Sequence, residues 1–208
     1  GLKVDIMPKE ATIEAMVEPW VYFMGKQKGF LATAKKVKTS HVLVVDAYDV
    51  VTIGTPGQIL EKFIPMKIPF LCMSEINCWP WAKWADRFPP SNTEWRYMNT
   101  GLYLAETDAF IEVFEKWGVQ DQPSSIYDQD WIQDKYLADT SVLKLDYNCE
   151  ILQSLHGSWH VLSSSPGVLY NMVTKTFPLV AHDMGGADIR KDRCQELWRE
   201  DMRCQISS

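Results

Sequence analysis

Apolar residues follow two patterns that alternate along this chain: short continuous runs, and runs with helical spacing. Short apolar runs bounded by polar residues are typical of buried strands, whereas apolar positions three and four apart are typical of helices. Strands are predicted at 41–45, 69–75, 96–106, 141–147 and 177–186, and helices at 8–19, 28–40, 55–66, 107–118, 127–139 and 187–204. This alternation predicts an α/β fold with a mainly parallel sheet flanked by helices.

Local signals mark the ends of several elements. Thr55, which stands directly before a proline, is a typical capping residue at a helix start. Thr107 is the expected cap of the helix at 107–118, and Gly118 is its expected end. Residues 76–95 are rich in Trp and Pro without a regular period, which predicts a long, ordered, aromatic loop.

Size and composition narrow the class of protein. With 208 residues and 46% hydrophobic content, the chain can bury one sizeable core, so a single domain over residues 1–208 is expected. No apolar stretch reaches the roughly 20 residues of a membrane span, and the first residues lack the basic and apolar regions of a signal peptide. The formal net charge of −6 argues against a general affinity for nucleic acid.

Cysteine and lysine usage adds further expectations. The five cysteines are an odd number without CxxC spacing, which argues against a zinc site or a disulfide framework and indicates a reducing compartment such as the cytoplasm. Cys72 and Cys149 are expected to be buried free thiols. Basic residues cluster at 26–38 and 190–203; such clusters are usually solvated helix faces, and a phosphate-binding patch is the alternative.

Polar residues follow the predicted strands at the points where the strands end. Asp46 and Asp49 follow the first strand, Glu75 ends the second, and His182 lies in the last. Ligands of parallel sheets bind at the carboxyl ends of the strands, so these side chains are expected to share one rim. Carboxylates with an imidazole fit a divalent cation, and the imidazole favours Mn²⁺ over Mg²⁺. The alternative is that Asp46 and Asp49 are turn acids bonded to local backbone N–H groups, and spacing alone does not decide between the two.

Two neighbouring features have both a binding and a structural interpretation. Tyr48, between the two acids, could stack on a nucleotide base if the cation held a diphosphate, or it could pack in the core. Gly185 and Gly186, after His182, could let backbone N–H groups approach an anion, or they could form an ordinary turn.

Six short segments resemble a known family. They are "VVDAYDVV", "FLCMSE", "YMNTGLYLA", "YDQDWIQDKYL", "EILQSLHG" and "PLVAHDMGG". In order and spacing they resemble the glycosyltransferase domain of procollagen lysyl hydroxylases, and "GKQKGFLATAKKV" is similar to the segment before that family's metal motif. The resemblance spans roughly residues 20–190. It implies a GT-A-like (Rossmann-like) fold, a UDP-sugar donor and a Mn²⁺ ion, with Mg²⁺ as an alternative.

The resemblance also implies a ligand set. Asp46, Asp49 and His182 resemble the family's metal ligands, and Tyr48 resembles the ring that stacks on uracil. Lys28 lies in the basic segment near the diphosphate.

Other positions resemble the polar residues around the donor sugar and the acceptor. Glu75, Asn99 and Asp128 match them, and Asp128 is the candidate to assist catalysis. Gln129 and Gln153 match glutamines of the family, for which a structural role is an equal alternative.

Three departures from the family pattern are expected to matter. Tyr127 precedes Asp128 where the family has a run of acids, and the Trp-rich loop at 79–95 differs, so the acceptor side is expected to change. The chain is also expected to begin at the second strand of the GT-A pattern, with the first nucleotide-binding strand missing or supplied otherwise.

The implied activity is transfer of a hexose, glucose or galactose, from a UDP-sugar to a hydroxyl group with retention of anomeric configuration. The implied acceptor is a hydroxylysine-linked group in a collagen-like chain; a glycan or a hydroxymethylated pyrimidine in DNA is the alternative. A different interpretation is a degenerate, non-catalytic domain that binds a glycan or a protein partner through its Trp-rich loop. A hydrolase of nucleotide diphosphates that uses the same carboxylates is the third.

Overall fold

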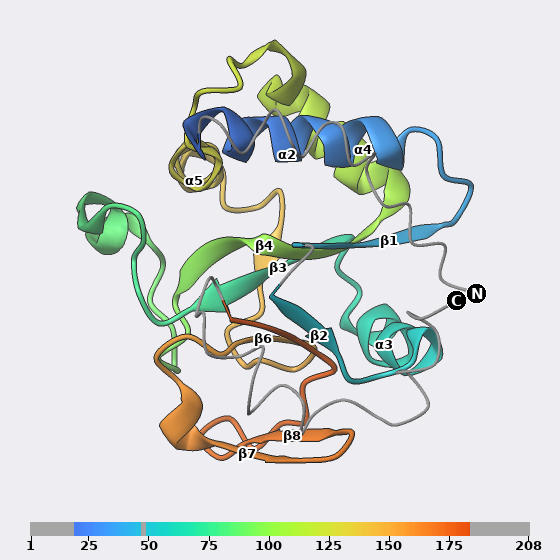
Figure 1. Cartoon of the computed structure of the whole chain (residues 1–208), viewed down its shortest axis with the longest axis vertical. Coiled ribbons are helices and arrows are strands. Elements are labelled where there is room, and N and C mark those ends of the chain that lie inside the picture. The colour runs from blue at the N-terminus through green and yellow to red at the C-terminus, as the bar shows by residue number, and fades with distance from the viewer. Residues whose placement is uncertain (1–18, 47–48, 184–208) are drawn as a thin grey trace.

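The structure is a computed structural model, and it describes residues 19–46 and 49–183 (Figure 1). The predicted helix at 187–204 lies outside the described residues, as does the predicted helix at 8–19 apart from Pro19. None of the described helices has both the length and the apolar content that crossing a bilayer requires.

The described elements alternate along the chain much as the apolar pattern predicts, but the predicted helix boundaries at residues 19, 28 and 40 are wrong, because one helix begins at Pro19 and ends at Ala34. The helices are α2 (Pro19–Ala34), α3 (Pro56–Phe63), α4 (Thr107–Trp117) and α5 (Asp128–Ala138), and the short 3₁₀ helices are η1 (Ile64–Met66), η2 (Ala82–Arg87), η3 (Val119–Asp121) and η4 (Trp159–Val161). The strands are β1 (His41–Val45), β2 (Val50–Thr52), β3 (Phe70–Glu75), β4 (Tyr97–Glu106), β5 (Lys144–Leu145), β6 (Leu152–Ser154), β7 (Leu162–Ser165), β8 (Val168–Asn171) and β9 (Val180–His182).

The strands form a main sheet, a second sheet and a hairpin. The main sheet has the order β1-β4-β3-β5, the second has the order β2-β9-β6, and β7 pairs with β8. In Figure 1, α2, α4 and α5 lie together on one side of the main sheet, and the second sheet and α3 lie on the other. This arrangement confirms the predicted α/β class with helices flanking a sheet.

The sheets are mixed rather than mainly parallel. β4 runs antiparallel to both β1 and β3, whereas β3 and β5 are parallel. A parallel neighbour requires a crossover, usually a helix, that returns the chain to the starting edge. The loop at 76–96, between β3 and β4, contains only the short η2, and it re-enters the sheet at the edge where β3 ends. As a result β1, β3 and β5 share one direction, and β4 opposes them.

The apolar runs are continuous because the main sheet is buried on both faces. Phe70 and Cys72 of β3 belong to the core on the helix side, while Leu71 and Met73, which alternate with them, belong to the core shared with α3 and the second sheet. A strand buried on both faces has no solvent side on which polar residues could alternate. The helix-side core includes stacked rings of α4, among them Phe110 and Phe114, whose ring centroids are 4.2 Å apart.

Some helix boundaries follow the predicted signals and others do not. The side chain of Thr55 accepts a hydrogen bond from the backbone N–H of Gln58 and so caps α3, and Gly118, with φ 72°, ends α4. The predicted cap at Thr107 is wrong, because its hydroxyl donates to the backbone oxygen of Thr39 at 2.7 Å instead. That bond ties the start of α4 to the segment before β1.

Candidate functional site

Three strand ends meet at one edge of the main sheet. Because β1, β3 and β5 run in one direction, the residues after β1 and at the end of β3 share an edge with the first half of β4. Asp46 follows β1 and donates its backbone N–H to the oxygen of Gly101 in β4 at 3.0 Å. Glu75 ends β3, and Asn99 of β4 lies beside it. The predicted shared rim is therefore present despite the mixed sheet.

Strand pairing in the second sheet places Asp49 beside His182. Val50, the first residue of β2, pairs with His182 of β9 in antiparallel register. The backbone oxygen of Asp49 accepts a hydrogen bond from Asp183 N at 2.9 Å. Nε2 of His182 lies 3.3 Å from Oδ1 of Asp49 and 3.6 Å from Oδ2 of Asp46.

Gly101 leaves the space that the cluster occupies. A Cβ atom at this position would lie 2.3 Å from Cε1 of His182 and 2.9 Å from Oδ2 of Asp46. Both distances are shorter than real Cβ contacts. Glycine is therefore required here by the close approach of side chains to the backbone of β4, which is a known role of glycine inside strands.

The three side chains form a donor set that fits a divalent cation. One ligand atom each from Asp46, Asp49 and His182 lies within 4.8 Å of the others. His182 is 2% exposed, and neither of its ring nitrogens has a hydrogen-bond partner among the described residues. Buried polar atoms are normally paired, so an imidazole facing two carboxylates suits a cation that accepts all three ligands. The structure brings the predicted ligands together, and their role as ligands stays a prediction.

Asp128 stands at the start of α5 and accepts bonds on both carboxylate oxygens. It is 1% exposed. Oδ2 accepts from Nε2 of Gln27 at 2.6 Å and from the hydroxyl of Thr100 at 3.5 Å, while Oδ1 accepts from its neighbour's N–H, that of Gln129, at 2.8 Å. The predicted site residue is thus a fully engaged acceptor with a fixed orientation.

Lys26 of α2 joins Asp128 to the candidate metal cluster. Its ammonium lies 2.9 Å from Oδ1 of Asp46 and 3.4 Å from Oδ2 of Asp128. Burial alone would lower the pKa of Lys26, but the charges of Asp128 and Asp46 raise it, and the net result is a pKa above the ordinary value. Lys26 therefore stays protonated at neutral pH.

The resemblance implies a site role for Lys28, near the diphosphate, and not for Lys26. Lys28 is half-buried and pairs with no acid in the part of the chain that the structure describes, although its backbone oxygen accepts from Gln120 at 3.2 Å. Residues two apart on a helix point to different sides, so only one of the two lysines can face the cluster. The choice between them depends on how α2 is rotated against β4, which the sequence does not show.

The carboxyl group of Glu75 is buried and held by the side-chain amides of Asn99 and Gln129, which together form the amide cage. Its Oε1 accepts from Nδ2 of Asn99 at 3.0 Å and from Nε2 of Gln129 at 2.8 Å. Burial raises the pKa of Glu75 to about 7, although both hydrogen bonds act to lower it. Oδ1 of Asn99 in turn accepts from the N–H of Gly101 at 2.9 Å, which connects this cage to the candidate metal cluster. A carboxyl group with such a pKa can gain or lose a proton at neutral pH.

The aromatic loop is tied to this cage. The backbone oxygen of Trp79 accepts from Gln129 at 2.8 Å and from Gln133 at 2.9 Å. The Trp79 ring packs edge-on against Tyr127, with centroids 4.9 Å apart. Trp79 and Trp81 are nonetheless about half exposed, at 49% and 51%. The loop therefore presents aromatic surface beside Glu75.

The remaining predicted residues lie elsewhere or outside the description. Gln153 is buried and bonds Asn171 at 2.9 Å, which indicates a structural position beneath the β7–β8 hairpin. Tyr48, Gly185 and Gly186 lie outside the described residues.

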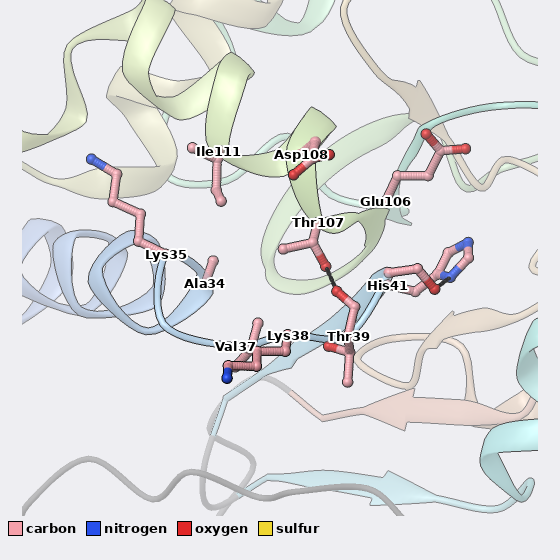
Figure 2. Close-up of a pocket in the computed structure, with 11 residues that line it drawn as sticks. Ala34, Lys35, Val37, Lys38, Thr39, His41, Glu106, Thr107, Asp108 and Ile111 are labelled. Atoms are coloured by element: carbon pink, nitrogen blue, oxygen red, sulfur yellow. Dashed lines mark hydrogen bonds between the residues drawn. The ribbon is translucent and has the colours of Figure 1, made fainter.

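A pocket is present at the opposite edge of the main sheet (Figure 2). It is lined by His41, the first residue of β1, and by Glu106, the last residue of β4, together with the start of α4. None of the predicted site residues lines it.

Comparison with known proteins places the chain in a family. The family model described as the PLOD GT domain matches residues 25–196. Among curated proteins, "Uncharacterized protein R699" of Acanthamoeba polyphaga mimivirus is 29% identical over 160 residues, which cover 76% of this chain and 34% of that protein. "Multifunctional procollagen lysine hydroxylase and glycosyltransferase LH3" of Homo sapiens is 26% identical over 150 residues, which cover 69% of this chain and 20% of that protein.

A third relative, "Procollagen-lysine,2-oxoglutarate 5-dioxygenase" of Drosophila melanogaster, is 27% identical over 166 residues, 74% of this chain and 22% of that protein. The chain thus spans about a fifth to a third of the length of these relatives. The match to the family model extends from α2 through β9, so it includes every side chain of the cluster described above. On this basis the chain belongs to the PLOD GT domain family, a family of glycosyltransferase domains.

Proposed function

We propose that this chain is a metal-dependent hexosyltransferase that moves glucose or galactose from a UDP-sugar to a hydroxyl acceptor. The observation that carries the proposal is the cluster of Asp46, Asp49 and His182, whose ligand atoms lie within 4.8 Å of one another, in a member of a glycosyltransferase domain family. The cluster lies where ligands of α/β sheets bind, at the ends of the strands.

The ligands proposed for Mn²⁺, or alternatively Mg²⁺, are Asp46, Asp49 and His182. When bound there, the ion neutralises the charge that develops on a leaving diphosphate. Gly101 leaves room for the side chains of His182 and Asp46, and His182 is buried at 2% exposed. A degenerate domain that binds no metal would have no reason to keep two carboxylates around a buried imidazole whose nitrogens lack hydrogen-bond partners in the described part of the chain, which favours an enzyme over a non-catalytic module.

Three polar residues beside the cluster, Asp128, Glu75 and Asn99, are proposed to act on the sugar and the acceptor. Asp128 is held as an acceptor by donors from two elements, α2 and β4, so it can orient hydroxyl groups of the donor sugar without moving. Glu75, with a pKa of about 7, is proposed to exchange a proton with the acceptor hydroxyl. Asn99 fixes the Glu75 carboxyl group. Retention of anomeric configuration is part of the proposal.

The proposed acceptor is a hydroxylysine-linked group in a collagen-like peptide. The human relative's printed name combines procollagen lysine hydroxylase and glycosyltransferase, which supports this class. The exposed rings of Trp79 and Trp81, in the loop that is bonded to Gln129, offer stacking surface for a sugar or a peptide. The net charge of −6 disfavours duplex DNA, although a hydroxymethylated pyrimidine has the same hydroxyl chemistry.

The test is release of UDP from UDP-glucose and UDP-galactose with Mn²⁺, measured with and without hydroxylysyl peptides. Asp49→Ala is expected to lower the rate at least roughly 100-fold, because it removes a ligand of the ion that stabilises the leaving group. Asp108→Ala is the matched control, since Asp108 is exposed at the opposite edge of the sheet. Full activity of Asp49→Ala would reject the metal role.

The non-catalytic alternative is separated by thermal melting with UDP and Mn²⁺. A ligand at about 100 times its Kd stabilises the native state by about 2.7 kcal/mol, which raises the melting temperature by several degrees. A shift together with UDP release supports the transferase. A shift without turnover of any donor or acceptor, including hydroxymethylated DNA, would support the binding module.

A further inference from the structure

Lys26 lies between the candidate metal cluster and Asp128. It is contributed by α2, while Asp46 follows β1 and Asp128 begins α5, so three elements meet at one ammonium group. The Lys26 side chain is 14% exposed, and that of Asp128 is 2% exposed. Water screens this interaction poorly, so the charges affect one another far more strongly than a surface ion pair would.

The two oxygens of each carboxylate contact different partners. Oδ1 of Asp46 faces Lys26 at 2.9 Å, and Oδ2 faces Nε2 of His182 at 3.6 Å. Oδ2 of Asp128 faces Lys26 at 3.4 Å, and Oδ1 accepts the N–H of Gln129 at 2.8 Å. A partial rotation of either carboxylate would break the contact with Lys26. The ammonium therefore fixes the plane of the Asp46 carboxylate, with one oxygen toward Lys26 and the other toward His182.

We propose that Lys26 is a positioning residue that holds Asp46 ready for the metal and ties the metal cluster to Asp128. The proposal rests on the proposed function, because it takes the ion at Asp46, Asp49 and His182 to be Mn²⁺. In the metal-free protein, Lys26 neutralises the buried Asp128 and the partly exposed Asp46, which would otherwise repel one another. In the metal-bound protein, the positive charge of Lys26 lies beside a ligand of the cation. Lys26 therefore lowers the affinity for Mn²⁺ while it keeps the site assembled.

This role predicts effects of opposite sign for Lys26→Met. Removing the charge leaves Asp128 buried without a cation, so the metal-free melting temperature is expected to fall by roughly 6–20 °C. Removing a positive charge beside the site is expected to tighten Mn²⁺ binding roughly tenfold. Turnover at saturating Mn²⁺ is expected to fall, because Asp46 and Asp128 are no longer held. If Lys26 only maintained packing, its substitution would lower stability without tightening Mn²⁺ binding.

The experiment measures free Mn²⁺ by electron paramagnetic resonance during titration of the wild-type protein, Lys26→Met and Lys26→Arg, and melting of each without metal. Lys26→Arg keeps the charge and is expected to bind Mn²⁺ within about threefold of the wild type. Lys35→Met is the matched control, because Lys35 forms an exposed ion pair with Glu115 at 2.6 Å. It is expected to change neither Mn²⁺ affinity nor, beyond a degree or two, stability.

A double-variant cycle keeps the test decisive if Lys26→Met folds poorly. Lys26→Met with Asp128→Asn removes the unpaired buried charge, and it is expected to melt at a higher temperature than Lys26→Met alone. Additive losses of stability in the cycle would overturn the link between Lys26 and Asp128. Mn²⁺ binding to Lys26→Met that is no tighter than to the wild type would overturn the role of Lys26 and leave the proposed function standing. Absence of Mn²⁺ binding by the wild type would overturn both.

Discussion

Replacing Gly101 with alanine tests the candidate site with the smallest possible change. The added Cβ would lie 2.3 Å from Cε1 and 2.6 Å from Nδ1 of His182, and 2.9 Å from Oδ2 of Asp46. Ordinary van der Waals contact begins at 3.4 Å, so the imidazole would have to move by about 1.1 Å. His182 is 2% exposed and its backbone is paired within the second sheet, so the movement must come from the side chain within a buried site.

The displacement is large compared with what a metal site tolerates. Metal–ligand distances vary by only about 0.2 Å around their ideal values, so a shift of this size removes His182 or Asp46 from the coordination sphere. We therefore expect Gly101→Ala to weaken Mn²⁺ binding at least about 100-fold. Overpacking of this kind costs about 1–3 kcal/mol, which corresponds to a fall in melting temperature of roughly 2–12 °C.

The assay is Mn²⁺ titration of folded Gly101→Ala, with thermal melting as the measure of stability. Gly25→Ala is the matched control, because a Cβ at Gly25 in α2 would meet nothing within 4 Å. Alanine is a better helix former than glycine by about 1 kcal/mol, so Gly25→Ala should be as stable as the wild type or more stable, with unchanged Mn²⁺ affinity. Wild-type Mn²⁺ affinity in Gly101→Ala would refute the assembly of the ligands around β4.

Two further predictions concern buried carboxyl groups. The pKa of Glu75 is raised from 4.5 to about 7, so its contribution to stability is complete below pH 4.5 and is lost as the pH rises through 7, at a cost of about 3 kcal/mol. Metal-free Glu75→Gln should therefore gain stability relative to the wild type between pH 5 and pH 8, and parallel melting curves across that range would contradict this. Asp146 accepts backbone N–H bonds from Glu150, Ile151 and Leu152, each at 2.9 Å. Asp146→Asn should lower the melting temperature by roughly 2–12 °C, because an amide cannot accept all three bonds; an unchanged melting temperature would show that this turn is held otherwise.

The sequence was sufficient for the parts of the fold that depend on local signals. The alternation of strands and helices, the cap at Thr55 and the end of α4 at Gly118 each follow from residues that are close together in the chain. The buried free thiols of Cys72 and Cys149 also follow from composition and spacing. The place of Asp46 in the cluster is also predictable, because it follows a strand and strand direction places such residues at one edge of the sheet.

Other features depend on contacts between distant segments. Strands β2, β6, β7 and β8 have only three or four residues each, too few to show a period. Lys26 meets Asp128 across 102 positions of the chain, and a lysine-rich segment does not reveal which lysine turns inward. Gly101 lies inside the predicted strand at 96–106, and a glycine inside a strand often marks a close approach, so this signal could have indicated the site.

The central claim is that Asp46, Asp49 and His182 hold one divalent ion. Its most direct test is an anomalous difference map from crystals grown with Mn²⁺, with data collected at the manganese absorption edge. A single strong peak within about 2.5 Å of one oxygen of each aspartate and of a His182 ring nitrogen is the expected result. A map with Mn²⁺ bound at another place, or with no peak among these three side chains at saturating Mn²⁺, would contradict the account.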